Sequence, residues 1–89
     1  MSLIALHHIL LKSPLLAQDV LKELQLGADF AALAQEYSAC PSGQNQGFAG
    51  YHQAEQLPPA LVEALEQSDQ AYLGPIATEF GHHILKAKL

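Results

Sequence analysis

Two copies of the tetrapeptide His-His-Ile-Leu contain four of the five histidines of this chain. One copy lies near the start, at His7–Leu10, and the other near the end, at His82–Leu85. Histidine can exchange a proton near neutral pH, and a neutral imidazole both donates and accepts a hydrogen bond. Neighbouring side chains of a strand point to opposite faces, so one histidine of each pair can face a cleft. If the two segments lie side by side, two imidazoles meet, and we expect any chemistry there.

The length and composition indicate one small domain. The chain has 89 residues, of which 49% are hydrophobic, enough for a single core. A lone cysteine, Cys40, excludes an internal disulfide and fits a reducing compartment. The apolar run Leu3–Leu11 is interrupted by histidines and has neither the length nor the charge pattern of a membrane span or signal peptide. We therefore expect a cytoplasmic protein without a membrane partner, or alternatively a domain excised from an exported chaperone.

The charge pattern argues against nucleic acid as a partner. The net charge is -5, and the four basic residues are all lysines: Lys12, Lys22, Lys86 and Lys88. Recognition of phosphates depends on clustered cations and on the paired N–H groups of arginine. No nucleic-acid partner is therefore expected.

The first half of the chain predicts a strand followed by two helices. Leu3–Leu11 is typical of a strand, and Ser13 is placed to cap a helix with Pro14 in its first turn. Gly27 is expected to close that helix, and Asp29 to cap a second one.

The second half is less regular. Apolar periodicity disappears between Ser38 and Gly50, which predicts a structured loop or a short helical turn before a possible short strand. Pro58-Pro59 is expected to open another helix, Gly74-Pro75 to form a turn, and Phe80–Leu89 to form a closing strand. Strands at both ends with helices between them predict an α+β domain whose terminal strands pair in the middle of one sheet.

Four segments of the chain match one further pattern in order and spacing. They are Ala5-Leu6-x-His8-Ile9-Leu10-Leu11-Lys12, Gly27-Ala28-Asp29-Phe30-x-x-Leu33-Ala34, Ser38-x-Cys40-Pro41-Ser42-Gly43 and Gly74-Pro75-Ile76-x-Thr78-x-Phe80-Gly81-x-His83-Ile84. With these segments almost the whole chain resembles the parvulin family of peptidyl-prolyl cis-trans isomerases. The resemblance implies one isomerase domain over residues 1–89. It also implies a four-stranded antiparallel sheet wrapped by about four helices, in the order β-α-α-α-β-α-β-β.

The resemblance also implies an activity that needs no nucleophile and no cofactor. Amide resonance sets a barrier of ~18–20 kcal/mol to rotation about an X-Pro bond. A catalyst can favour the twisted amide by seating proline in an apolar pocket and by excluding water. The expected partners are proline-containing polypeptides whose folding the protein assists, and a monomer is expected.

The family pattern implies a polar catalytic group made of His8, Cys40, Thr78 and His83. Our hypothesis is a hydrogen-bonded network in which the two imidazoles fix each other's tautomer and Thr78 supports one of them. Cys40 would lie at the edge of the site, facing the substrate amide, and a covalent role for it is not needed.

The proline pocket departs from the family pattern. The resemblance places substrate-binding residues at Ala49, Leu57, Leu61 and Phe80, where relatives commonly have Leu, Met and Phe at the first three positions. A leucine's volume is lost at Ala49 and an aromatic wall at Leu61. The alternative function is therefore a catalytically weak parvulin-like module that binds peptides or acts as a chaperone.

Two further alternatives bear on specificity and metals. Phosphate-directed relatives have a basic cluster after the first strand, whereas this chain has Lys12-Ser13-Pro14-Leu15, so we expect a non-phospho-specific enzyme that accepts an uncharged or apolar residue before proline. Two histidines and a cysteine could converge on zinc or copper, but the chain has no Cys-x-x-Cys and no His-x-x-x-His, so no metal is expected. His7, His52 and His82 are interpreted as core or exposed residues.

Overall fold

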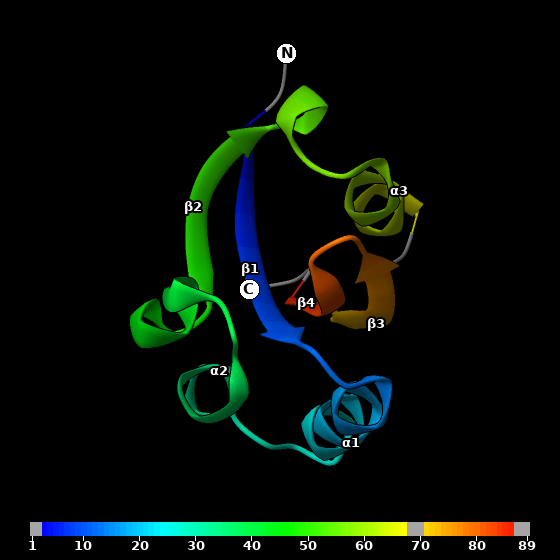
Figure 1. Cartoon of the computed structure of the whole chain (residues 1–89). Coiled ribbons are helices and arrows are strands. Elements are labelled where there is room, and N and C mark those ends of the chain that lie inside the picture. Colours follow the sequence, from blue (N-terminus) through cyan, green and yellow to red (C-terminus); the bar gives the residue numbers. More distant parts are fainter. Residues whose placement is uncertain (1–2, 68–70, 87–89) are drawn as a thin grey trace.

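Four strands and three α-helices make up the computed structural model, which describes residues 3–67 and 71–86 (Figure 1). The elements in order are β1 (Leu3–Leu11), α1 (Pro14–Gln25), α2 (Phe30–Tyr37), the 3-10 turn η1 (Pro41–Asn45), β2 (Phe48–Gln53), the 3-10 turn η2 (Ala54–Gln56), α3 (Pro59–Gln67), β3 (Tyr72–Thr78) and β4 (Gly81–Lys86). The α+β class and the order of elements are confirmed. The third helix of the expected order is the short 3-10 turn η1. About four helices were implied, and the described residues contain three α-helices and two 3-10 turns.

The first and last strands lie next to each other in the centre of the sheet. The strand order is β2-β1-β4-β3, and all three pairings are antiparallel. In the central pair His8 lies opposite Leu85, and Leu10 lies opposite His83. The terminal strands therefore pair as predicted, and one histidine of each matched run comes to the same region of the sheet.

The first two helices begin at the capping residues that the sequence indicates. The Ser13 hydroxyl accepts a hydrogen bond from the Leu16 N–H at 3.3 Å, and the Asp29 carboxylate accepts one from the Ala32 N–H at 3.1 Å. Each cap satisfies a backbone donor that the first helical turn leaves free. Gly27, with a φ of 105°, turns the chain out of α1.

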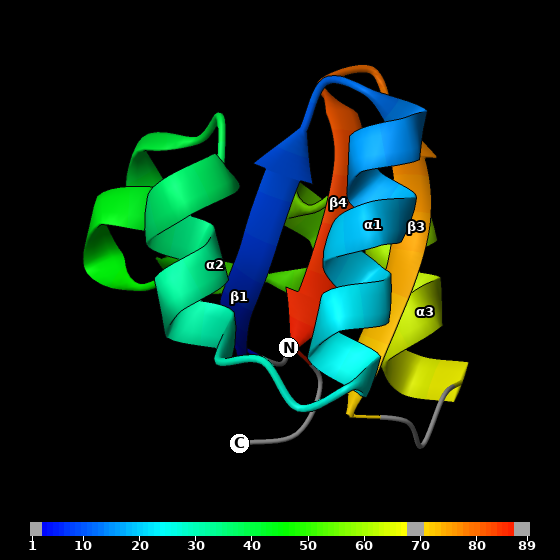
Figure 2. The same ribbon diagram turned by 90° about the horizontal axis from the view of Figure 1, so that it is seen from below.

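Apolar side chains cover both faces of the sheet. On one face α1 and α2 pack over β1 and β4, and on the other face α3 packs over the sheet (Figure 2). The larger cluster consists of Ile9, Leu11, Ala17, Val20, Leu24, Phe30, Leu33, Ala34 and Ile84. The smaller cluster, beneath α3, consists of Leu6, Leu61, Leu73 and Leu85. Alternation along β1 sends Leu6 and His8 to the α3 face and Ile9 to the other.

The turn expected at Gly74-Pro75 is wrong. Both residues lie within β3, where the pairing register with β4 shifts between Leu73 and Ile76. A Cβ at Gly74 would lie 2.5 Å from the carbonyl oxygen of His83, and φ at Gly74 is 126°. Only glycine fits such a close approach, so the Gly-Pro pair marks an irregularity within the strand instead of its end.

Two smaller expectations concern the end of the chain and membranes. The closing strand begins at Gly81 instead of Phe80, and residues 87–89 of the expected strand lie outside the described residues. Across residues 3–67 and 71–86, we find no helix that combines the length and apolarity required to cross a bilayer.

Candidate active site

The two histidine runs meet through one imidazole from each. The Nδ1 atoms of His8 and His83 lie 3.0 Å apart, and the two rings are nearly parallel, with 18° between their planes and 5.2 Å between their centroids. Their strands are adjacent, and the register sets the two side chains diagonally across the β1–β4 pair on the α3 face. His7 points to the other face and contacts the ring of Phe48, at a centroid distance of 4.9 Å.

Thr78 extends this contact into a chain of three side chains. Its Oγ1 lies 2.7 Å from Nε2 of His83 and accepts a hydrogen bond from the Phe80 N–H at 3.2 Å. A neutral imidazole has one donor and one acceptor nitrogen. If the Thr78 hydroxyl donates to Nε2 of His83, then His83 donates through Nδ1 to His8. If instead His8 donates to His83, then His83 donates through Nε2 to the Thr78 hydroxyl, while the Phe80 N–H donates to Thr78 in both cases. The three side chains therefore change hydrogen-bond direction together.

Burial keeps both imidazoles neutral. His8 is 6% exposed and His83 is 3% exposed. Loss of water contact, followed by the nearby His83 and His52, lowers the pKa of His8 from its usual 6.5 to about 4. Burial, followed by the charge of His82, also lowers the pKa of His83. Near neutral pH the pair is thus an uncharged hydrogen-bonding unit.

Two buried polar atoms lack a hydrogen-bond partner among residues 3–67 and 71–86. They are Nε2 of His8 and the hydroxyl of Ser42 in η1. A buried polar atom without a partner is unfavourable by about 1–3 kcal/mol.

The loop after α2 is fixed to β1 beside the histidine. Ser38 Oγ accepts hydrogen bonds from the N–H groups of Leu10 at 3.1 Å and Cys40 at 3.3 Å. Further along, the His8 N–H donates to the carbonyl of Gly47 at 2.9 Å, and a Cβ at Gly47 would lie 2.8 Å from the Phe30 ring. The glycine, with a φ of 87°, therefore allows the loop to pack closely against the histidine strand.

Cys40 lies on this loop at the start of η1. Its side chain is half-buried and its thiol is free. Among the described residues we find no hydrogen bond between this thiol and either histidine. The structure thus places Cys40 on the loop beside His8 but does not join it to the Thr78–His83–His8 chain.

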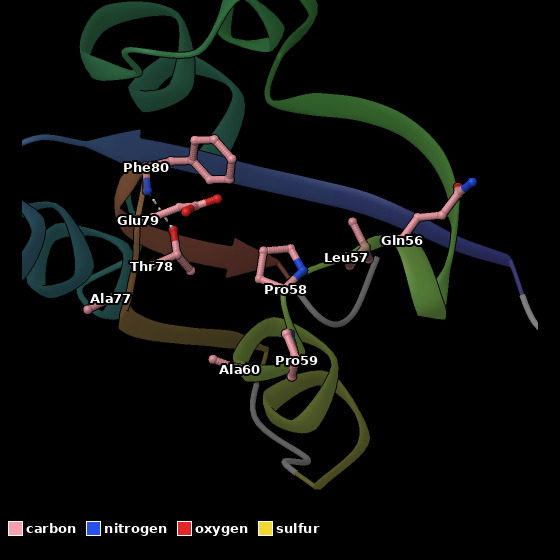
Figure 3. Close-up of a pocket in the computed structure, with 9 residues that line it drawn as sticks. All are labelled: Gln56, Leu57, Pro58, Pro59, Ala60, Ala77, Thr78, Glu79 and Phe80. Atoms are coloured by element: carbon pink, nitrogen blue, oxygen red, sulfur yellow. Dashed lines mark hydrogen bonds between the residues drawn. The ribbon is translucent and has the colours of Figure 1, made fainter.

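An open groove of about 540 Å³ lies between the start of α3 and the turn that joins β3 to β4 (Figure 3). Its lining residues are Gln56, Leu57, Pro58, Pro59, Ala60, Ala77, Thr78, Glu79 and Phe80. Leu57, Thr78 and Phe80 were expected from the sequence at the site. Thr78 belongs both to the groove lining and to the buried chain, so it connects the two.

Other site residues expected from the sequence lie behind the groove. Leu61 is 1% exposed and packs with Leu6, Leu73 and Leu85, so its expected direct contact with substrate is not supported. Ala49 is partly buried against the same cluster. The helical spacing of Leu57 and Leu61 fits core as well as pocket, and the packing of α3 on the sheet turns Leu61 inward.

Several groove residues carry no functional signal in the sequence. Pro58 and Pro59 are explained by a helix start, yet both form groove walls because the groove ends at that helix (Figure 3). Glu79 also lines the groove. The Lys12 ammonium donates to the Phe80 carbonyl at 2.8 Å and ties the end of β1 to the β3–β4 turn. Only the folded chain brings these residues together.

The described part of the chain contains no group of side chains arranged to bind a metal ion. Within residues 3–67 and 71–86, no three His, Cys, Asp or Glu side chains are grouped as a metal site requires. The imidazole nitrogens of His83 are both engaged, one with His8 and one with Thr78.

Comparison with known proteins identifies the family and the fold. The sequence profile described as "Rotamase: PPIC-type PPIASE domain" matches residues 8–88. The chain belongs to the PPIC-type peptidyl-prolyl isomerase, or parvulin, family. The family expected from the sequence is confirmed, and with it the membership in a class of peptidyl-prolyl cis-trans isomerases.

Relatives of this parvulin domain occur within larger folding factors. It is 41% identical to the chaperone SurA of Methylobacillus flagellatus over 71 residues, which are 79% of this chain and 16% of SurA. The solved parvulin domain of PpiD from Escherichia coli is 33% identical, with a TM-score of 0.76, and the match covers 94% of this chain and 83% of that one. A third similar structure comes from a pair of SurA-like chaperones of Campylobacter jejuni, one of which is described as periplasmic. It is 26% identical, with a TM-score of 0.80, and the match covers 94% of this chain and 37% of that chain. The chain thus spans about a sixth of the length of the SurA relative.

Proposed function

We propose that this parvulin domain accelerates rotation about X-Pro bonds of polypeptides without a covalent intermediate and without a cofactor. The observation that carries the proposal is the connection between the groove and the buried histidines. Thr78 lines the groove and bonds His83, which in turn bonds His8. Rotation must cross a barrier of ~18–20 kcal/mol that comes from amide resonance, so binding that favours the twisted amide is sufficient for catalysis.

The apolar part of the groove supplies a seat for proline. Leu57, Pro58 and Phe80 offer apolar surface on facing walls (Figure 3). Twisting the amide reduces its charge separation, so an environment with little water disfavours the planar ground state more than the rotated state. Leu57 and Ala49 both pack against the core cluster that contains Leu61, and this cluster supports the groove wall from beneath.

The polar part of the groove supplies a fixed hydroxyl. Thr78 is the group of the hydrogen-bonded chain that can reach the substrate, so we assign it the catalytic contact with the rotating amide. His83 and His8, both nearly inaccessible to solvent, act as positioning residues that set the direction of the hydroxyl proton. Cys40 is proposed at the edge of the site, with no covalent bond to substrate.

The groove favours unphosphorylated substrates. Of the residues that line it, none is cationic, and Glu79 carries a carboxylate. A phosphoserine before proline would bring nearly two negative charges to this surface without a partner. An uncharged or apolar residue before proline is the better match for Leu57 and Phe80.

A longer folding factor is the setting that we propose for this domain. Support comes from the chaperone SurA, of which the match covers 16%, and from the SurA-like Campylobacter pair, of which one is described as periplasmic. The expected cytoplasmic location gains no support from these relatives, so we favour the alternative, a domain of an exported chaperone. The partners are then unfolded, proline-containing polypeptides, and a monomeric domain remains our proposal.

A catalytically weak peptide-binding module is the second candidate. It is favoured by the inward position of Leu61, which leaves Phe80, 53% exposed, as the aromatic residue at the groove. A groove with less apolar wall holds proline less tightly and gives a smaller preference for the twisted amide.

NMR exchange spectroscopy on Ala-X-Pro-Phe peptides tests the two candidates. The peptides would carry Leu, Glu or phosphoserine as X, and the proteins would be the wild type, His83→Ala and the matched control His82→Ala from the same strand. We expect cis–trans exchange to be fastest with Leu, lost in a still-folded His83→Ala protein and retained in His82→Ala. Binding shifts without exchange in the wild type would establish the peptide-binding module and reject the enzyme.

A further inference from the structure

A second hollow adjoins the proposed active-site groove. It has a volume of about 320 Å³ and lies between η2 and the first turns of α3. Its lining residues are Ala54, Glu55, Leu57, Pro59, Val62 and Glu63. Leu57 and Pro59, both labelled in Figure 3, also line the groove, so the two depressions share a wall.

The second hollow combines an apolar floor with an acidic rim. Ala54, Leu57 and Val62 are partly buried, whereas the carboxylates of Glu55 and Glu63 are exposed. Of the residues that line this hollow, none carries a positive charge. The surface thus matches an apolar side chain that is followed or preceded by a lysine or arginine.

We propose that this hollow is a second subsite for the same polypeptide that occupies the groove, and that it selects an apolar residue next to a basic one. The inference rests on the proposed isomerase function, because the occupant is the continuation of the substrate. The shared wall of Leu57 and Pro59 argues for one continuous occupant over two separate ligands. An extended chain advances about 3.3 Å per residue and returns to the same side every second residue. A residue two or four positions from proline can therefore face the second hollow.

The subsite gives this domain a preference that the groove alone does not supply. A segment such as proline flanked at a short distance by Leu-Lys gains apolar contact with Val62 and attraction to Glu55 and Glu63. Exposed charge pairs are individually weak and are screened by salt, so the preference should be modest and largest at low ionic strength. Acidic segments should be disfavoured by the same carboxylates.

Matched peptides test the subsite separately from the isomerase. The core peptide Ala-Leu-Pro-Phe would be compared with versions extended before it by Ser-Leu-Lys, Ser-Leu-Glu or Ser-Gly-Lys, and with versions extended after it by Leu-Lys, Leu-Glu or Gly-Lys. The added leucine then lies four residues before proline or two residues after it. Affinity and exchange rate would be measured by NMR on the whole chain. Proteins would be the wild type, the double variant Glu55→Gln/Glu63→Gln, and the control Glu66→Gln, an exposed glutamate of α3 outside the hollow.

We expect the Leu-Lys extension on one side to bind about threefold to tenfold more tightly than the Leu-Glu extension at low salt. That ratio should fall toward one in high salt and in the double variant, and it should persist in Glu66→Gln. Amide shifts at Ala54 and Val62 should accompany only the extended peptides.

Equal affinities for the Leu-Lys and Leu-Glu extensions, with the core peptide still bound and turned over, would overturn the subsite and leave the isomerase intact. A ratio that persists in the double variant would likewise overturn it. If the core peptide neither binds nor exchanges while folded protein is present, the proposed function fails, and the subsite fails with it.

Discussion

Acidification should destabilise the domain through His8. In the folded chain burial holds the pKa of His8 at about 4, whereas the unfolded chain exposes an ordinary imidazole with a pKa near 6.5. Between these two values the unfolded chain binds more protons than the folded one, so the free energy of unfolding falls as the pH falls. Above about pH 6.5 and below about pH 4 the contribution of His8 is constant.

The size of this effect follows from the pKa difference. At about 1.4 kcal/mol per pH unit, a pKa of about 4 in place of 6.5 corresponds to about 3 kcal/mol of stability lost on going from neutral pH to pH 4. The lowered pKa of His83 acts in the same direction. A loss of this size is a large fraction of the stability of a small domain, commonly about 5–15 kcal/mol.

Urea unfolding at a series of pH values measures the loss. The chain has no tryptophan, so far-UV circular dichroism is the suitable signal. A His8→Gln variant removes the titrating group, and its stability should vary less with pH than that of the wild type. His7→Gln, from the same strand, controls for loss of an imidazole on the opposite face. Direct NMR titration of His8 would refute the reasoning if its pKa in the folded protein is close to 6.5, as would parallel pH curves for the wild type and His8→Gln.

Three substitutions test the other parts of the site. Thr78→Val leaves Nε2 of His83 without its partner, so it should lower the free energy of unfolding by about 1–3 kcal/mol and slow cis–trans exchange of X-Pro peptides. Thr78→Ser keeps the hydroxyl and should restore both the stability measured in urea and the exchange rate measured by NMR. Equal exchange rates in the two variants would remove the hydroxyl from the mechanism. Leu61→Ala removes most of a side chain that is 1% exposed, so urea titrations should show a loss of stability of about 2–5 kcal/mol. The exchange rate per folded molecule should fall less than in Thr78→Val. Unchanged stability would contradict the placement of Leu61 in the core. Cys40→Ala should retain most of the exchange rate, and its complete loss in a folded protein would show that the thiol takes part in the reaction.

The apolar periodicity and the capping residues made much of the fold predictable from the sequence. Ser13 and Asp29 satisfy local backbone donors, so the start of each helix depends on residues three positions apart and can be read without the fold. The two histidine runs were equally informative because strand alternation alone sends one imidazole of each to a common face.

The burial of the individual site residues could not be predicted in the same way. His8 and His83 share a face with Thr78, but whether they line a groove or lie beneath it depends on what covers them. Both imidazoles are covered, and Thr78 is the member of the chain that lines the groove. The sequence determines which side chains can meet, whereas packing decides which of them reaches solvent.

Tertiary packing likewise decided the walls of the groove and the course of β3. Leu61 has the spacing of a pocket residue, yet α3 docks with that residue against the sheet, and the groove is formed by Pro58 and Pro59 instead. Gly74 has the local signal of a turn, but the pairing of Leu73 and Ile76 with β4 on either side keeps it within the strand, where only glycine can approach the His83 carbonyl. The sequence by itself thus determined most of the helices and strands and the side chains able to do chemistry, because these depend on local spacing, and its motifs carried the resemblance to the family. Only the tertiary structure decided exposure and contact, because these depend on segments distant in the chain.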